Sequence, residues 1–330
     1  MRAVVTGGAG FIGSHVVDAL LARGDEVHVL DDLSKGKRER VAAGAELHVG
    51  DIRDPDAVFG AVRPETVFHL AAQADVRLSV ERPDVDADVN VLGTVRILEA
   101  ARRHGAKVIF SSTGGAIYGE CTSPATESAE RRPLAPYGTS KLCGEEYLAT
   151  WNRLHGTQHV SLRFANVYGP RQEPHGEAGV VAIFMGLLQE GGMPQIYGDG
   201  SQTRDYVFVE DVVRAMLVAL DNKGGVFNVG TGVETSVLEL YDAIQRASGI
   251  TRASGFAEAR LGELQRSVLD ISLAERELGW RAAETFESGL RKTVRWYVDN
   301  RQTVLGRSAG VSRHQAAVKE GALAALRWLL

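Results

Sequence analysis

A tyrosine and a lysine four residues apart, Tyr137 and Lys141, form the pair with the clearest chemical potential in this sequence. They lie at the head of a helix predicted over residues 136–155. Positions i and i+4 share one helical face, so both side chains can point into one cleft. A fixed ammonium favours phenolate over phenol by Coulomb attraction, so the tyrosine can accept a proton near neutral pH. The pair is therefore a candidate acid–base catalyst for a hydroxyl such as that of a sugar.

This spacing also occurs at the exposed start of many ordinary helices, so the N-terminal residues are needed as context. Residues 3–6 predict a buried strand, and residues 7–13 (GGAGFIG) predict a tight turn that opens a helix through residue 23. Residues 27–30 predict a second strand, which ends in Asp31 and Asp32. A strand, a glycine turn, a helix, a strand and a terminal acid together form a dinucleotide-binding unit.

Three glycines of this turn have distinct expected roles. Gly7 allows the tight turn, Gly10 lets the backbone approach a pyrophosphate, and Gly13 lets the helix pack closely. The helix N-terminus offers free amide groups to the phosphates. Asp31 lies 18 residues past Gly13, where its carboxylate can accept hydrogen bonds from the adenosine ribose. Because this carboxylate would repel a 2′-phosphate, NAD is favoured over NADP.

Strands and helices alternate over the first 160 or so residues, which predicts an α/β fold with a doubly wound parallel (Rossmann) sheet. Further strands are expected at 46–49, 66–70, 107–112 and 160–164, with helices at 55–62, 83–104 and 136–155. Ligands bind outside the carboxyl ends of such strands. The residues expected at these ends are Asp51, Ala71, Ala72, Ser111, Ser112, Thr113 and Asn166.

The pattern changes after residue 170, so we expect a NAD-binding domain over 1–170 and a smaller α/β substrate lobe, mainly over 171–305. In the second part, helices are expected at 180–189, 211–220, 237–247, 272–278 and 286–299, and strands at 194–197 and 207–209. Without an internal repeat or a proline-rich linker, the two lobes should share a cleft. Residues 306–330 form a tail of unknown role, with helical character from 314 onward.

Composition limits the kind of protein this is. The net charge is −5, with 24% charged and 44% hydrophobic residues, which does not suggest a nucleic-acid surface. The basic cluster Lys35, Lys37, Arg38 and Arg40 is interpreted as a solvated loop. No run of 18 apolar residues occurs and a strand pattern begins at Arg2, so we expect neither a membrane span nor a signal peptide.

Metal and disulfide chemistry are not expected either. Cys121 and Cys143 are too few for a disulfide framework or a cysteine zinc site, which favours a reduced, cytoplasmic location. His69 and His175 lack a second ligand at zinc spacing, and His69 is expected to end its strand beneath the cofactor.

Taken together, these motifs resemble the extended short-chain dehydrogenase/reductase family and, more closely, its UDP-glucose 4-epimerase members. The matching segments are TGGAGFIGSH (6–15), GDI (50–52), HLAAQ (69–73), NVLGT (90–94), SSTGGAIYG (111–119), PYGTSK (136–141), NVYGPR (166–171), GDG (198–200) and RDY (204–206). The resemblance covers roughly residues 1–300. The last 25 or so residues have no recognised counterpart.

The resemblance implies a cofactor site and a catalytic trio. The implied NAD-binding residues are Gly7, Gly10, Phe11 and Ile12 at the pyrophosphate, Asp31 at the ribose, Asp51 and Ile52 at the adenine, Leu70, Ala71, Ala72 and Ala74 at the nicotinamide side, and Asn90 in support. Thr113 aligns with the family's catalytic hydroxyl, and Tyr137 with its base and acid. Lys141 would bridge the nicotinamide ribose and tune Tyr137.

The resemblance also implies how a UDP-sugar substrate binds. Asn166, Arg204 and Arg260 would hold the diphosphate, which suits arginine because its planar fork makes two charge-assisted bonds. Gln195 and Tyr197 would cradle the uracil and its ribose. Ser267 would limit the sugar pocket, and its small side chain should leave room for a 2-acetamido group.

The implied reaction interconverts UDP-galactose and UDP-glucose through a transient 4-keto sugar. Because Ser267 is small, the implied substrates also include the N-acetylated pair of UDP-sugars. A UDP-glucuronate 4-epimerase or decarboxylase stays open, because Arg77 could meet a carboxylate. A 4,6-dehydratase would need Asp-Glu after Thr113, where Gly114-Gly115 stand. A non-catalytic nucleotide sensor should lack the tyrosine–lysine pair.

The resemblance also implies a homodimer, in which the helices at 83–104 and 136–155 pair into a four-helix bundle. Tyr147 and Trp151 on the second helix are interpreted as packing or subunit-contact residues.

Overall fold

The protein is described by a computed structural model that covers residues 1–174, 179–259 and 264–300. His175, Arg260 and the tail at 306–330 lie outside these ranges.

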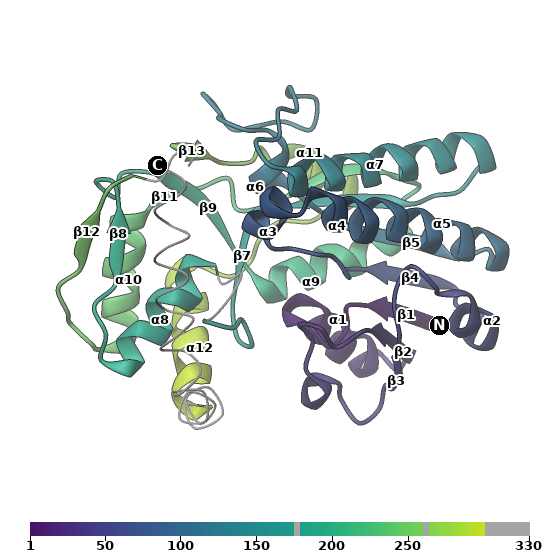
Figure 1. Cartoon of the computed structure of the whole chain (residues 1–330), viewed down its shortest axis with the longest axis horizontal. Helices are drawn as coiled ribbons and strands as arrows, with labels where there is room; N and C mark the ends of the chain where they lie inside the picture. Colours follow the sequence, from purple (N-terminus) through teal and green to yellow (C-terminus); the bar gives the residue numbers. More distant parts are fainter. Residues whose placement is uncertain (175–178, 260–263, 301–330) are drawn as a thin grey trace.

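The larger lobe is built on a seven-stranded sheet in the order β10-β6-β5-β4-β1-β2-β3, in which every neighbouring pair is parallel (Figure 1). Its strands are β1 (Arg2–Thr6), β2 (Glu26–Asp31), β3 (Glu46–Val49), β4 (Thr66–His69), β5 (Lys107–Thr113), β6 (Val160–Phe164) and β10 (Gly225–Val229).

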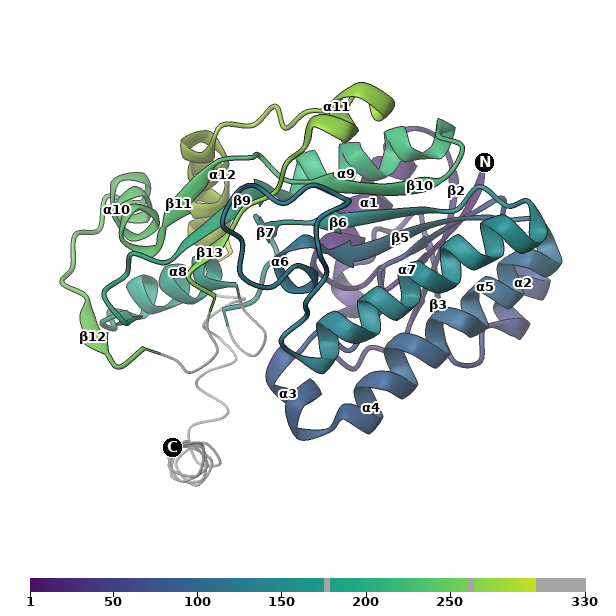
Figure 2. The same cartoon turned by 90° about the horizontal axis from the view of Figure 1, so that it is seen from above.

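Helices cover both faces of this sheet, which confirms the predicted doubly wound fold (Figure 2). On one face α1 (Phe11–Ala22) and α9 (Val209–Val218) pack against Val27 and Val29 of β2. On the other face lie α2 (Asp56–Val62), α5 (Gly93–His104) and α7 (Pro136–His155). Alternate side chains of a strand point to opposite faces. The near-continuous apolar runs of the central strands therefore fill both cores.

The helix predicted over 83–104 has the expected bounds but is less regular than expected. It consists of α4 (Pro83–Ala87), a π-helical turn (Asp88–Leu92) and α5, and α3 (Val76–Glu81) precedes it. Such turns commonly occur at functional sites. A one-turn helix, α6 (Gly114–Ile117), follows β5 directly.

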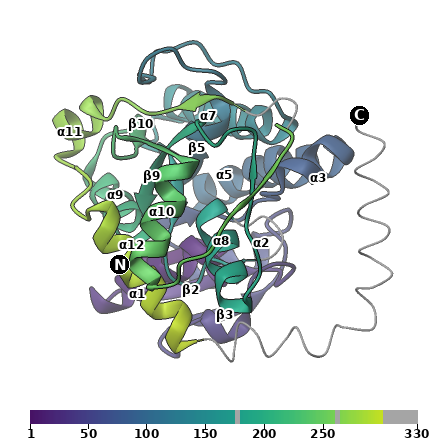
Figure 3. The same ribbon diagram turned by 90° about the vertical axis from the view of Figure 1, so that its left-hand side faces the viewer.

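The smaller lobe contains a four-stranded and a two-stranded sheet with helices around them (Figures 1 and 3). Its strands are β7 (Asn166–Tyr168), β8 (Gln195–Tyr197), β9 (Thr203–Phe208), β11 (Glu234–Ser236), β12 (Gly255–Ala257) and β13 (Arg266–Ser267). Its helices are α8 (Val180–Glu190), α10 (Val237–Ser248) and α12 (Phe286–Asp299), while α11 (Ser272–Leu278) packs toward β10. The strand predicted at 207–209 was placed too late, because β9 begins at Thr203 and Val209 already starts α9.

Segments after residue 170 contribute to both lobes. β10 forms the edge of the large sheet beside β6, and α9 packs on α1. Two further contacts tie the lobes together where β7 ends: the His15 Nε2 atom lies 3.0 Å from the Pro170 carbonyl oxygen, and Arg171 donates to Asp18 at 2.6 Å. The site is therefore built from both lobes.

Candidate active site

A cavity of about 690 Å³ lies at the carboxyl ends of the parallel strands. It brings together the three predicted catalytic residues and every predicted cofactor residue except Asn90. The predicted residues that line it are Gly7, Gly10, Phe11, Ile12, Asp31, Asp51, Ile52, Leu70, Ala71, Ala72, Ala74, Thr113, Tyr137 and Lys141. Residues that are 134 positions apart in the chain thus meet at one sheet edge, as the topology requires.

The glycine turn between β1 and α1 forms one wall. Gly7 has φ +70°, and a Cβ atom there would lie 2.7 Å from the Ala71 nitrogen, so only glycine fits. A Cβ at Gly13 would lie 2.2 Å from the Gly7 carbonyl oxygen, so α1 packs directly on the turn. The N-cap, Gly10, gives α1 no side-chain cap. Its first amide groups therefore face the cavity as an anion-binding site.

Asp31 ends β2 and is buried beside the glycine turn. Its carboxylate accepts hydrogen bonds from the Ala9 and Leu33 amides, each at 2.9 Å. Burial raises the pKa of Asp31, while the two amide donors oppose that shift. A rigidly held carboxylate at the end of the second strand has the placement expected of a ribose ligand.

The basic loop after β2 is only partly the solvated segment that the sequence suggested, because Lys35 and Arg38 are exposed but Lys37 and Arg40 are not. Lys35 and Arg40 line the cavity. The Arg40 side chain is only 9% exposed, and Arg40 and Lys37 both pair with Glu173, which lies just after β7. The sequence interpretation was wrong for Lys37 and Arg40, because their counter-charge Glu173 is more than 130 residues away, 133 in the case of Arg40. Arg40 and Glu173 both line the cavity, so these ion pairs join the loop after β2 to the segment after β7 at the cavity wall.

Lys141 is 4% exposed and lies 4.9 Å above the centre of the Phe110 ring. Its ammonium donates to the Ser111 carbonyl oxygen at 2.9 Å. Burial lowers the pKa of Lys141 to about 8, and the carboxylates of Asp86 and Glu145 oppose that shift. The side chain is thus mostly cationic at neutral pH, and it shares the cavity wall with Tyr137 one helical turn away.

A buried polar cluster holds the loop that carries the nicotinamide-side residues. Asn90 accepts from the Gln73 amide and donates to the Gln73 carbonyl, both at 2.8 Å. Asn90 therefore holds this loop in place by hydrogen bonds and does not itself line the cavity. Asp86, fully buried, accepts from Asn90 at 2.9 Å, from Gln73 at 3.0 Å and from the Ser140 hydroxyl.

Asp86 was missed in the sequence, although its spacing offered a signal. Asp86 and Asn90 stand at i and i+4, so they share a helical face. Ser140 immediately precedes Lys141 on α7, and the Asp86 carboxylate thereby joins the catalytic helix to the loop at residues 71–75.

His69 ends β4 as predicted and lies within a chain of hydrogen bonds. Its Nδ1 atom is 2.8 Å from the Thr6 hydroxyl, and its Nε2 atom is 3.1 Å from the Thr94 hydroxyl, which itself donates to the Asn90 carbonyl. Burial, aided by Lys141, lowers the pKa of His69 to about 3. The imidazole ring is therefore uncharged near neutral pH, which fits a role in holding Thr6 and Thr94 in position.

Thr113 ends β5 on the cavity wall, and the two glycines after it bear on the dehydratase alternative. A Cβ at Gly114 would lie 2.6 Å from Leu269, which leaves no room for an acidic side chain. A Cβ at Gly115 would lie 3.5 Å from Asn166 Oδ1 and 4.0 Å from Thr113 Oγ1. Asn166 and Thr113 therefore both lie near Gly115, and neither position 114 nor position 115 carries the acidic side chain that the dehydratase alternative needs.

The predicted substrate residues gather in the smaller lobe. β7 pairs with β9, and β9 pairs with β13, so Asn166, Arg204 and Ser267 share one sheet, with Arg204 and Ser267 directly opposite each other. Gln195 and Tyr197 lie on β8, which is fixed to β9 by a 2.9 Å hydrogen bond from Gln202 to the Tyr197 carbonyl. None of these five residues lines the cofactor cavity. Arg260 lies outside the described residues.

The site residues fit a dinucleotide with a nicotinamide. The uncapped helix and close-packed glycines suit a pyrophosphate, and the buried Asp31 suits a ribose diol. The apolar loop at Leu70–Ala72 suits a nicotinamide face next to Tyr137 and Lys141.

None of the helices in the described ranges has the length and apolar character needed to cross a bilayer.

Comparison with known proteins agrees with this geometry. The model of the NAD dependent epimerase/dehydratase family matches residues 3–230. The UDP-glucose 4-epimerase of Mycolicibacterium smegmatis is 47% identical over 313 residues, which span 92% of this chain and 100% of the relative.

Solved structures show the same similarity. The Thermotoga maritima UDP-glucose 4-epimerase with UDP-glucose superposes with a TM-score of 0.89 at 45% identity, covering 91% of this chain and 99% of that one. The Thermus thermophilus UDP-glucose 4-epimerase in complex with NAD has a TM-score of 0.86 at 47% identity, covering 90% and 99%. These similarities confirm the expected fold, family and NAD dependence. This chain belongs to the NAD dependent epimerase/dehydratase family.

Proposed function

We propose that this protein interconverts UDP-galactose and UDP-glucose by epimerisation at C4, with NAD held throughout the catalytic cycle. One observation carries the proposal: Thr113, Tyr137 and Lys141 line the same cavity as the glycine turn and Asp31. This shared cavity supports a site in which the residues that would move a proton lie next to a bound dinucleotide. The names of the similar proteins support the same activity.

When bound, NAD would supply reversible hydride transfer at C4 of the sugar, so the reaction would have no net redox change. Tyr137 as phenolate takes the proton of the 4-hydroxyl, and Thr113 donates a hydrogen bond to the same oxygen. The Lys141 ammonium favours that phenolate. Arg204 and Asn166 hold the nucleotide, so that the 4-keto sugar can turn without leaving.

The direct test is to incubate the purified full chain with UDP-galactose and no added NAD. We expect UDP-glucose to form, and we expect denaturation of the same preparation to release NAD, about one per chain. Bound NAD without conversion would instead support the nucleotide-sensor alternative. Preferential conversion of UDP-glucuronate would point to the glucuronate series.

The glucuronate alternative rested on Arg77. This residue lies on α3 with its side chain 74% exposed, and its Nε atom is 4.0 Å from Asp75 Oδ1. It is not among the residues that line the cavity. No observation on the described residues therefore favours a carboxylate-bearing sugar.

Ser267 supports a broader sugar range. It is 5% exposed and lies opposite Arg204 in the β13–β9 register. Its small side chain beside a residue proposed to hold the diphosphate leaves space that a larger residue would fill. We therefore propose that the enzyme also accepts the N-acetylated UDP-sugars.

The proposed assembly is a homodimer through α5 and α7. Tyr147, Trp151 and Leu154 stand at i, i+4 and i+7 and form one stripe along α7. Leu154 is 68% exposed and Tyr147 39% exposed. An apolar stripe of this kind suits the self-complementary surface of a twofold dimer.

The cysteines, Cys121 and Cys143, are free thiols, which supports the proposed cytoplasmic location.

A further inference from the structure

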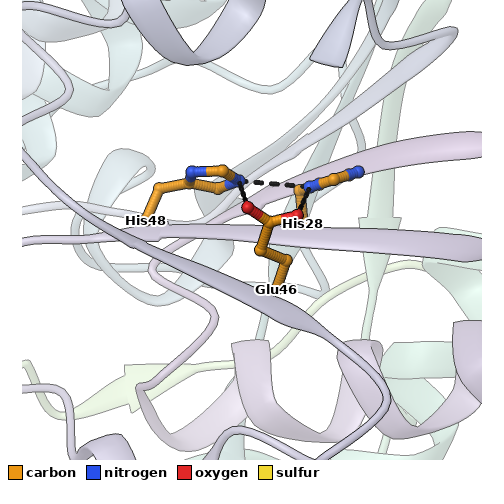
Figure 4. A group of neighbouring side chains, drawn as sticks. All are labelled: His28, Glu46 and His48. Atoms are coloured by element: carbon orange, nitrogen blue, oxygen red, sulfur yellow. Dashed lines mark hydrogen bonds and ion pairs between the residues drawn. The ribbon is translucent and has the colours of Figure 1, made fainter. Parts of the chain in front are cut away.

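Two histidines and a glutamate meet on neighbouring strands near the edge of the large sheet (Figure 4). His28 lies on β2 directly opposite Glu46 of β3, and His48 follows Glu46 by two residues. Residues i and i+2 of a strand point to the same face, so all three side chains share one face of the sheet. Within the ranges that the structure describes, this is the one group of its kind.

The donor atoms of this cluster are spaced as metal ligands are. His28 Nδ1 lies 3.1 Å from His48 Nε2. The Glu46 carboxylate oxygens lie 3.5 Å from His28 Nδ1 and 3.8 Å from His48 Nε2. A tetrahedral zinc ion with bonds of about 2.0–2.1 Å separates its ligands by roughly 3.3 Å. Small side-chain rotations therefore allow all three to bind one ion, with a fourth position for water.

A second carboxylate completes the arrangement. Glu26, also on β2, has its Oε1 atom 3.1 Å from His28 Nε2. When Nε2–H donates to this carboxylate, the lone pair of Nδ1 points toward His48 and Glu46. Metal-binding histidines are commonly held in this way by a carboxylate on the far ring nitrogen. The His28 side chain is 10% exposed and thus fixed, while that of Glu46 is 67% exposed, which gives an ion a route in.

We propose that His28, Glu46 and His48 form a binding site for a divalent transition-metal ion, with zinc as the best match. Two imidazoles and one carboxylate are a donor set typical of zinc. The ion would tie the edge strand β3 to β2, and β3 leads into Gly50, Asp51 and Ile52 on the cavity wall. None of the three ligands lines the cofactor cavity, so the site is independent of the proposed activity.

The test uses the full chain with its bound NAD, stripped with a chelator and titrated with Zn²⁺ against a chromophoric competitor. We expect one ion per chain at this site. Glu26→Gln should weaken binding about 10–100-fold, and His48→Ala at least as strongly. His104→Ala, which removes an imidazole at the end of α5, is the matched control and should leave affinity unchanged. Equal zinc affinity of the wild type and His48→Ala would overturn the proposal. A loss of zinc affinity in His104→Ala as large as that in His48→Ala would also overturn it.

Thermal unfolding gives a second measurement in case His48→Ala folds poorly. Zinc should raise the unfolding midpoint of the wild type, because an ion that binds only the native state stabilises it. Glu46→Gln changes an exposed side chain, so its fold should persist while the zinc-dependent rise is lost. A rise of the same size in Glu46→Gln and the wild type would show that these residues do not hold the ion.

Discussion

At the scale of single residues, the proposal that Ser267 limits the size of the sugar substituent can be tested by one substitution. Ser267→Tyr should lower the ratio of activity on UDP-N-acetylgalactosamine to activity on UDP-galactose by about 10–200-fold, the range typical of steric discrimination in a pocket. Steady-state kcat/KM for both substrates measures this ratio. Ser272→Tyr, at an exposed position at the start of α11, is the control. A ratio that stays constant in Ser267→Tyr would remove this residue from the sugar pocket.

Individual site residues could be predicted where the sequence places them at strand ends, but their partners could not. His69 was expected to end its strand beneath the cofactor, and it does end β4. Its hydrogen-bond partners Thr6 and Thr94 are 63 and 25 residues away, and only the fold brings them together. Arg40 was misinterpreted for the same reason, because Glu173 belongs to a distant segment.

At the scale of elements, Asp86 connects α4 to the catalytic helix α7. The Asp86 charge raises the pKa of Lys141, which burial lowers to about 8. Lys141 therefore loses its charge as the pH rises through about 8, and kcat should fall there. Asp86→Asn removes the opposing charge, so the alkaline limb of the kcat–pH profile should move to lower pH by roughly one unit.

The control for this profile is Asp84→Asn, on the same helix. Asp84 is exposed and pairs with Arg82 on the surface, so the kcat–pH profile of Asp84→Asn should match that of the wild type. An alkaline limb that is unmoved in Asp86→Asn would mean that this carboxylate does not act on Lys141, even if kcat itself has dropped.

Long elements were predictable from the sequence and short ones were not. The helices at 136–155 and 286–299 match α7 and α12, because both are long and have clear end signals: Pro136 begins α7 and Gly156 ends it, and Thr285 caps α12. Strands β7, β11, β12 and β13 have two or three residues each, too few to show an alternating pattern. They form only because the smaller lobe provides neighbours for them, and they carry or flank the predicted substrate residues.

At the scale of the whole molecule, the stripe of Tyr147, Trp151 and Leu154 should pair with a second copy. Light scattering during gel filtration should give twice the 35.5 kDa chain mass for the wild type. Leu154→Glu places a charge in the proposed interface and should shift the protein to the monomer. Leu134→Glu changes another exposed leucine, 64% exposed and off this stripe, and should remain dimeric. A monomeric wild type would disprove the proposed dimer.

The most direct measurement of the central claim is turnover of UDP-galactose by Tyr137→Phe with its NAD content determined in the same sample. We expect the variant to retain NAD and its fold but to lose about 10²–10⁴-fold in kcat, because the ring stays while the hydroxyl that moves the proton is gone. Tyr147→Phe, which removes another hydroxyl from the same helix, should keep full turnover. Near-normal turnover by NAD-bound Tyr137→Phe would contradict the assignment of this tyrosine as the catalytic base.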